Sequence, residues 1–412
     1  MGKALRDNQV SGSFRILAEN QHAYEPFGKG IPGNPGFGDF SFTQHSKWSI
    51  IFSFAQDFGS HTLNYPFRIM TKTTLPTTGL FRNFLLSRPL VAALMLVAPV
   101  QGALAAEVTP FNTPSLNPLT QIFALPSPAL PETWSPGQTG LALQQEVASI
   151  YAVQSRNQEQ LILDGEVWRT SLTLDYGISQ NWLLSINLPF IQHKAGHLDG
   201  LIDDWHDWFS LPDGGRNKRP QNAFLYDYRS GSKVLHSQSS GSQGIGDLQL
   251  SLSHLIPLTD KQLFITFATK LPTGEADELT GSGSLDLSLS AMVRDSERLS
   301  DYRITLFWGG AVAYLGAADS SLARTQNHWV WSTRFGAGWA LIPNFHLKAQ
   351  LDHHSAVYDS PLRAIGGHAL QLTAGISWHV APDTRLDLAF SEDLATTVTP
   401  DITFSAAVRQ GF

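Results

Sequence analysis

The chain has 412 residues, of which 42% are hydrophobic and 15% are charged, with a formal net charge of −7 and no cysteine. Without cysteine, the chain has neither a disulfide framework nor a thiol that could carry a lipid anchor. The acidic balance argues against a nucleic-acid partner, and the scarcity of Ala/Glu/Lys-rich stretches argues against a helical bundle.

Residues 70–105 have the three-part layout of a secretory signal peptide. Basic residues precede an apolar run over residues 89–100, which is too short to span a membrane as a helix. A small-x-small sequence follows, so we expect cleavage between Ala105 and Ala106. A buried helix of a globular domain is the alternative interpretation of this segment.

Signal peptides stand at the start of a protein, so we expect translation to begin at Met70. Residues 1–69 are then interpreted as a mis-assigned upstream extension, and a genuine long presequence is the alternative. Removal of residues 1–105 leaves 19 Lys+Arg and 30 Asp+Glu, so the exported chain would carry a net charge of about −11.

Residues 106–138 form a proline-rich segment with seven prolines. Proline cannot occupy a helix interior or a central strand, because it lacks the backbone N–H and fixes its φ angle. We therefore expect an extended periplasmic arm, lying inside or beneath the domain that follows.

Residues 139–412 alternate between apolar and polar side chains with a period of two, which predicts strands. The stretch "SLTLDYGISQNWLLSINLPF" shows two such strands joined by a short turn. Short turns are expected at one end of the strands and longer loops at the other. An even strand number with this asymmetry is typical of an outer-membrane barrel, so we predict an all-β fold, a transmembrane antiparallel β-barrel of about 12 strands, within a range of about 10–14.

The final twelve residues, "DITFSAAVRQGF", continue the alternation to the end of the chain. In a closed barrel the last strand pairs with the first, so that no strand edge faces lipid. We expect Phe412 to lie at the periplasmic interface, where aromatic rings are favoured, and Arg409 to face the lumen.

The signal peptide, the alternating strands and the terminal Phe412 together resemble Gram-negative outer-membrane proteins. This resemblance implies location in the cell outer membrane and delivery by the barrel insertion machinery, with Phe412 as the insertion signal, although Gln410 departs from the usual pattern. The stretches "NPLTQIFALP", "LIDDWHDWFSLPDGGR" and "GIGDLQLSLSHLI" resemble an uncharacterised family of outer-membrane barrels, a domain of unknown function. "KLPTG" followed by "GSGSLDLSLS" is similar to barrels associated with aromatic-compound catabolism.

Charged residues of both signs occur at the alternate strand positions that are expected to face the lumen. They form either a selective conduit whose field sorts small solutes or a structural network in which opposite charges pair. The lumen-facing charges predicted from parity are Arg169, Asp175, Asp247, Lys270, Asp286, Arg303, Arg334, Lys348, Asp352, Arg385, Asp387 and Arg409.

Residues 195–242 form the longest loop. Apolar residues recur near helical spacing over 198–209, which predicts a short amphipathic helix at the barrel mouth or on the lipid surface. Acidic residues and a histidine over 203–207 admit a divalent-cation site as an alternative, but EF-hand spacing is missing from the sequence, so we predict no metal and no cofactor. The stretches "GGRNKRP" and "SGSKVLHSQSSGSQG" of this loop are expected to be flexible.

The expected function is non-enzymatic. We predict passive passage or binding of small solutes, or a structural role in the envelope, with outer-membrane lipids, the insertion machinery and small solutes as partners. The alternative is an outer-membrane hydrolase acting on lipid or peptide, for which "LDHHSAVYD" offers Asp352 and His354 at the extracellular rim.

Overall fold

The computed structural model describes residues 51–52, 67–68, 107–125, 135–200, 204, 220–394 and 398–412. The chain divides into two units, one of residues 1–79 and 203–212 and one of residues 80–202 and 213–412. In the first unit, β1 (Ile51–Phe52) pairs antiparallel with β2 (Phe67–Arg68). The predicted signal peptide with its cleavage site, and most of the predicted loop helix, lie outside the described residues.

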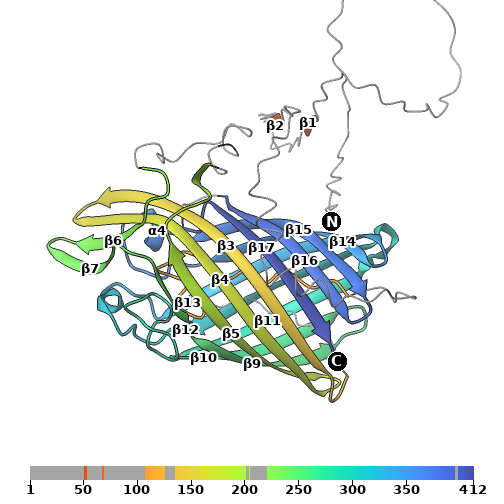
Figure 1. Cartoon of the computed structure of the whole chain (residues 1–412). Coiled ribbons are helices and arrows are strands. Elements are labelled where there is room, and N and C mark those ends of the chain that lie inside the picture. Colours follow the sequence, from red (N-terminus) through yellow and green to blue (C-terminus); the bar gives the residue numbers. More distant parts are fainter. Residues whose placement is uncertain are drawn as a thin grey trace, which may run out of the picture. The chain divides into compact units, whose positions relative to one another are not determined.

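The second unit is a closed antiparallel barrel of twelve strands, as the sequence predicted (Figure 1). Each strand pairs with the next in the chain, and β17 returns to pair with β3. The barrel strands are β3 (Thr139–Arg156), β4 (Glu159–Ser179), β5 (Trp182–Lys194), β9 (Leu248–Pro257), β10 (Gln262–Leu271), β11 (Asp286–Leu299), β12 (Ile304–Tyr314), β13 (Trp329–Ile342), β14 (Phe345–His354), β15 (Ala369–Ala381), β16 (Thr384–Asp393) and β17 (Ile402–Gly411).

The seam between the first and last strands is continuous. The pairing of β17 with β3 runs from Ile402 opposite Ser149 to Gly411 opposite Gly140. Beyond it, the Phe412 N–H donates to the Thr139 carbonyl at 2.8 Å, and the Thr139 N–H donates back at 3.2 Å. The end of the chain therefore completes the ring of hydrogen bonds and leaves no open edge in the wall.

The two ends of the barrel differ as predicted. One end carries short turns, whereas the other carries long loops that contain η3 (Ser321–Arg324) and α4 (Arg363–Gly366); η2 (Ser300–Tyr302) lies in a short turn. Part of the longest loop was expected to be flexible, but it forms the hairpin β6 (Leu225–Ser230) and β7 (Lys233–Gln238), which extends β4, and β8 (Ser242–Ile245), which pairs with β5. No helix in the described part of the chain is long and apolar enough to cross a membrane.

The outer face of the wall is apolar. Large hydrophobic side chains on alternate strand positions point away from the lumen, and a wall of this kind is stable only against lipid. Aromatic residues lie near both ends of the strands, as in the two interfacial girdles of membrane barrels. Exposed examples are Leu172, Leu174, Tyr176, Trp182, Phe190, Phe267, Leu289, Tyr314, Trp329, Phe335, Trp339 and Trp378.

Candidate functional site

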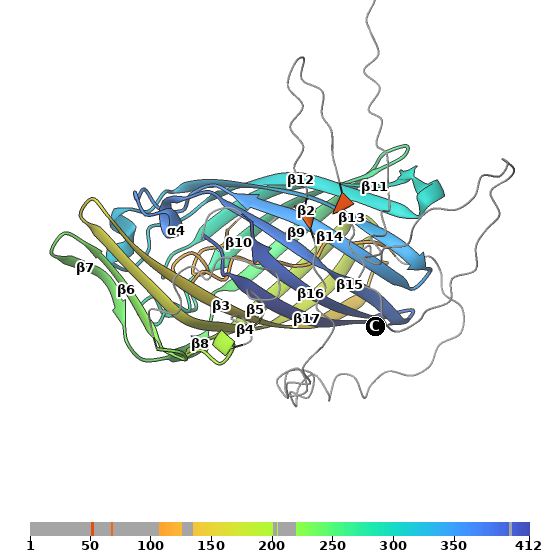
Figure 2. The same cartoon turned by 90° about the horizontal axis from the view of Figure 1, so that it is seen from above.

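Residues 107–125 of the proline-rich segment lie inside the barrel; we call them the arm, which is the orange coil in Figure 2. At the short-turn end of the barrel, Glu107 pairs with Arg294 of β11 at 2.9 Å. At the other end, the Asn117 side-chain amide donates to the carbonyls of Ala364 and Val398 in the long loops, at 3.0 and 2.8 Å. The arm therefore runs along the lumen, which is the first of the two expected positions, inside the barrel and not beneath it.

The lower half of the arm is bound by side chains of β14 and β16. Lys348 donates to the Thr109 carbonyl at 2.9 Å, and Arg385 donates to the Thr109 hydroxyl at 2.9 Å. Gln350 accepts from the backbone N–H of Phe111 at 2.8 Å and donates to its carbonyl at 3.3 Å. Because buried backbone polar groups need partners, these lumen side chains replace the neighbouring strand that the arm lacks.

The middle of the arm contacts two further parts of the wall. The Thr113 hydroxyl donates to Asp352 at 2.8 Å and accepts from Arg334 at 2.8 Å, while Arg334 pairs with Asp352 at 2.5 Å. Asn112 and Gln144 of β3 exchange two hydrogen bonds. All these partners are side chains of inward-facing wall positions, so none of these hydrogen bonds belongs to the strand ladder.

The arm tip, residues 117–124, ends in a buried charge network centred on Lys270 of β10. Its ammonium group donates to Asp247 at 2.5 Å, to the Ser282 hydroxyl at 2.5 Å and to the Ile122 carbonyl at 3.2 Å. Asp286 lies 3.3 Å away on its other side. A buried ammonium is stable only when several such acceptors replace water.

The two carboxylates of this network also hold backbone segments. Asp247 accepts from the N–H groups of Thr273, Gly274 and Ser282, and Asp286 accepts from those of Ala124 and Gly316. The network thus joins the arm tip to two of the long loops. Its members come from "GIGDLQL", "KLPTG", "GSGSLDL" and "NPLTQIFALP", so four separate sequence stretches meet at one point.

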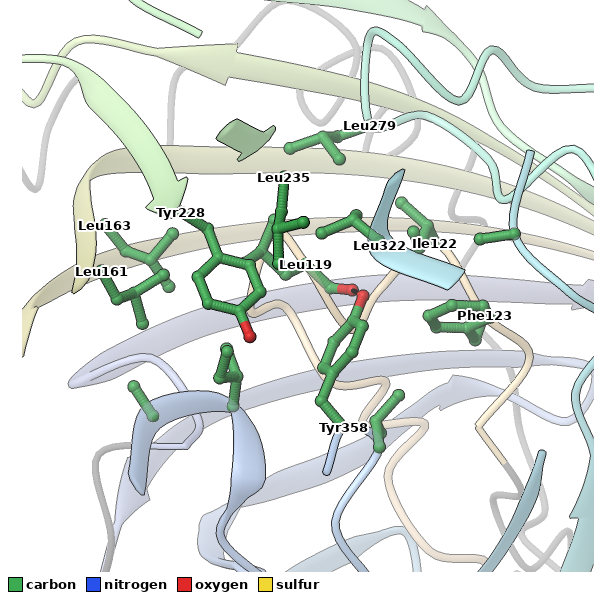
Figure 3. Packing of buried hydrophobic residues seen from close by; sticks show 14 of the residues in the cluster. Leu119, Ile122, Phe123, Leu161, Leu163, Tyr228, Leu235, Leu279, Leu322 and Tyr358 are labelled. Atoms are coloured by element: carbon green, nitrogen blue, oxygen red, sulfur yellow. Dashed lines mark hydrogen bonds between the residues drawn. The ribbon is translucent and has the colours of Figure 1, made fainter. Parts of the chain in front are cut away.

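Next to the network, a cluster of buried apolar residues packs at the long-loop end of the barrel; we call it the cap (Figure 3). Leu119, Ile122 and Phe123 of the arm tip pack among the loops, β3, β4 and the β6–β7 hairpin. The wall and loop members include Leu161, Leu163, Tyr226, Tyr228, Leu235, Leu279, Leu315, Leu322, Val357, Leu362 and Ile365. Burial of this much apolar surface stabilises the closed arrangement of arm and loops.

Tyr358, in the loop between β14 and β15, ties the cap to the backbone of the arm. Its hydroxyl donates to the Leu119 carbonyl at 2.5 Å, and its ring meets Phe123 edge-on (Figure 3). Complete burial raises the pKa of the Tyr358 hydroxyl far above its usual value. The phenol therefore stays protonated at neutral pH and remains a hydrogen-bond donor to the arm.

Beside the arm, the lumen retains a cavity of about 330 Å³. One side is formed by the arm, including Pro110, Phe111 and Asn112. Every barrel strand except β12 contributes to the rest of the lining. On β5, β9, β10 and β11 the lining side chains are mostly small and polar, whereas β4, β13, β14, β16 and β17 contribute charged side chains. The closed barrel is therefore not filled by the arm alone, and the space is large enough for a small molecule.

Eleven of the twelve charges predicted to face the lumen do so, and they meet opposite charges there. Arg169 lies across the strand pair from Glu146, a buried carboxylate that the sequence analysis missed although it continues the inward parity of β3. The ion pairs are Arg409–Asp175, Lys270 with Asp247 and Asp286, Arg334–Asp352, and Asp387 with Lys348 and Arg385.

Arg303 departs from the prediction. It follows η2 in the turn before β12, has a left-handed φ of 58° and is exposed to solvent. The register between β11 and β12 shifts between Asp295 and Leu299, so counting alternate residues along the sequence assigned Arg303 to the wrong face.

The residues of the alternative hydrolase site share one face but are not arranged as a catalytic pair. Asp352 is engaged by Arg334, Gln350 and Thr113, whereas His354 Nδ1 lies 2.9 Å from the Ser355 carbonyl oxygen. A catalytic acid or base must lie within hydrogen-bond reach of the proton that it transfers, and here both side chains are bonded to groups of the protein itself. No group of three or more His, Cys, Asp or Glu that could hold a metal ion occurs among the described residues.

Gly338 of β13 leaves room for the base of the arm. A β-carbon at this position would lie 2.4 Å from Cγ1 of Val108, so we expect Gly338→Ala to push the arm away from the wall at a cost of about 1–3 kcal/mol. Backbone hydrogen exchange over residues 108–113 should become faster in this variant. Val108→Ala in the same chain removes the clashing methyl groups and should restore the protection.

The matched control is Gly310→Ala on β12, where the nearest atom to a new β-carbon is the Ser332 carbonyl oxygen at 3.3 Å and no arm residue is near. Equal exchange in the arm of the Gly338→Ala and Gly310→Ala proteins would contradict the position of Val108 against Gly338.

The chain was compared with protein-family models, with curated protein sequences and with solved structures. The model of a family described as "Protein of unknown function (DUF3187)" matches residues 86–412, which agrees with the resemblance to an uncharacterised barrel family. No curated protein sequence matches the chain. Solved structures of outer-membrane channels and porins are similar in fold.

Among them is the COG4313 outer membrane channel from Pseudomonas putida F1, at 14% identity and a TM-score of 0.46, covering 69% of this chain and 97% of that one. The P. putida toluene transporter TodX shares 10% identity at a TM-score of 0.31, with 68% and 90% covered. The NanC porin shares 9% identity at a TM-score of 0.36, with 66% and 98% covered. At these values no solute is transferred from those proteins to this chain.

Proposed function

This chain belongs to the DUF3187 family of proteins of unknown function, and we propose that it is an outer-membrane channel for the passive passage of small solutes, closed by its own N-terminal arm. The arm carries the proposal. It lies in the lumen beside a cavity of about 330 Å³, and it is held by side chains of the wall instead of forming part of the wall. A segment bound in this way can move while the barrel stays intact.

The pairing of lumen charges supports an arm that can leave. Lys348 and Arg385 bind Thr109 of the arm, but both also pair with Asp387 of the wall, at 3.4 and 3.0 Å. Arg334 likewise keeps Asp352 when Thr113 departs. At these positions water can take the place of the arm without leaving an isolated charge, whereas Arg294 would exchange its pair with Glu107 for water and keep its bonds to Gln262.

The proposal places the barrel in the cell outer membrane. The apolar outer face supports contact with outer-membrane lipids, and the exposed Phe412 at the seam supports its part as the signal read by the insertion machinery. Export would use the predicted signal peptide, with cleavage between Ala105 and Ala106. Small solutes would be the remaining partners.

A removable cross-link between arm and wall tests the proposal. Thr113 and Asp352 touch through short side chains at 2.8 Å, and the natural chain has no cysteine, so Thr113→Cys/Asp352→Cys creates a single pair of thiols within reach of each other. In planar bilayers we expect the oxidised protein to remain closed and the same sample to conduct after reduction. The reduced state of the same protein serves as the matched control.

Equal conductance in the oxidised and reduced states would contradict gating by the arm. Silence in both states would contradict passage through the full-length protein and would favour a structural role in the envelope. The wild-type protein, treated with the same oxidant and reductant, shows whether either reagent acts on the bilayer itself.

A further inference from the structure

One side of the lumen carries a grid of short hydroxyl side chains, which we call the hydroxyl wall. It consists of Ser251 and Ser253 on β9, Thr266 on β10, and Ser288 and Ser290 on β11. In the strand register, Ser253, Thr266 and Ser290 form one row across the sheet. Ser251 and Ser288 flank Ala268 in the next row, and Ser185 of β5 continues it.

The spacing of this grid follows from sheet geometry. Rows on one face are two residues apart along a strand, or about 6.8 Å, and neighbouring strands lie about 4.8 Å apart. Hydroxyls on such a lattice can donate to and accept from several groups of one small molecule at the same time. The short side chains also leave this part of the cavity lining unobstructed.

The hydroxyl wall is not used by the closed structure. The side chains of Ser251, Ser288 and Ser290 make no hydrogen bond to another described residue, and Ser253 and Thr266 bond to each other at 2.8 Å. The hydrogen bonds from the wall strands to residues 109–113 come from β3, β13, β14 and β16. The hydroxyls therefore face the cavity with their hydrogen-bonding capacity available.

The seven charged side chains that line the cavity lie on other strands: six form ion pairs with one another, and Arg169 lies across the strand pair from the buried Glu146. Arg334 pairs with Asp352, Arg385 with Asp387, and Arg409 with Asp175. A charged solute would lose water and find no unpaired counter-ion, whereas an apolar solute would displace water from the hydroxyls and replace none of its hydrogen bonds. A neutral solute rich in hydroxyl groups loses water and regains equivalent bonds.

From these observations we infer that the hydroxyl wall is the binding and conduction face for small, uncharged, polyhydroxylated solutes. The inference rests on the proposed channel function and names its substrate class. A cavity of about 330 Å³ lies near the lower limit of ligand sites, about 300 Å³, so the solute has the size of a single sugar ring or a short polyol.

Solute flux into proteoliposomes tests the inference with three probes of similar size and hydroxyl pattern. They are glucose, which is neutral, gluconate, which is an anion, and glucosamine, which is a cation. For the full-length protein we expect glucose to enter several times faster than either charged probe. In Ser251→Ala/Ser288→Ala/Ser290→Ala, the ratio of glucose flux to small-ion conductance should fall about fivefold, because three hydroxyl partners of glucose are lost.

Ser296→Ala is the matched control, because Ser296 lies on β11 but is exposed at its periplasmic end. If ions pass but glucose is not preferred, or if the triple variant carries glucose as well as the wild type, the substrate class is wrong and the channel stands. If neither ions nor any probe passes through a correctly folded barrel, the proposed function fails and the inference fails with it.

Discussion

Replacing Lys270 by methionine is expected to release the arm tip and to raise the ion conductance of the full-length protein. The variant removes the bond to the Ile122 carbonyl and leaves the buried carboxylates of Asp247 and Asp286 without their cation. Loss of one partner from a buried ion pair costs about 3–5 kcal/mol. Here the lower end of that range applies, because both carboxylates keep backbone N–H donors.

Two measurements check this result. Hydrogen exchange of the backbone over residues 117–125 should become faster in Lys270→Met, and single-channel recordings should show longer or more frequent open periods. The matched control is Lys261→Met, which breaks a more exposed pair with Asp295 at 3.5 Å in a short turn, and for which about 0–1 kcal/mol is expected. Unchanged exchange at the arm tip in Lys270→Met would contradict the part that the network plays in holding the arm.

The wall of the barrel was predictable because its signals are local. Alternation along each strand, the unequal turns and the terminal aromatic residue each depend on neighbouring residues, and all twelve strands form where the pattern favours them. The face of a charged side chain follows from parity as long as the register is regular. Arg303 lies beyond the shift between Asp295 and Leu299, so parity failed there.

The hairpin of β6 and β7 was not predicted, because its stability depends on contacts with distant parts of the chain. The segment "SGSKVLHSQSSGSQG" is rich in serine and glycine, which indicates a loop. The hairpin is held by tertiary packing of Tyr226, Tyr228 and Leu235 in the cap, and by pairing with an extended β4. Neither contact can be seen in the local sequence.

The position of the arm could be anticipated only in part. Its prolines predict an extended chain, but an extended chain fits equally well below a barrel or within one. What fixes the arm inside is a set of distant partners, such as Gln350 for Phe111 and Tyr358 for Leu119. The hydroxyl wall was not predicted, because serine at alternate positions of a strand indicates only that this face of the strand is polar.

The second large effect is expected when the arm is removed. A chain without residues 107–134 keeps every barrel strand and loses the segment that crosses the lumen and fills the base of the cap. Because lumen width grows with strand number, an unobstructed barrel of twelve strands is expected to conduct at least about tenfold better than the full-length protein. The far-ultraviolet circular dichroism of both proteins shows whether the barrel has folded.

Single-channel conductance of this arm-deleted barrel, recorded beside the full-length protein in the same bilayer, is the most direct test of the claim that the arm closes the channel. We predict frequent, stable open channels from the arm-deleted barrel and rare openings from the full-length protein. A correctly folded arm-deleted barrel with the same conductance as the full-length protein would contradict the claim.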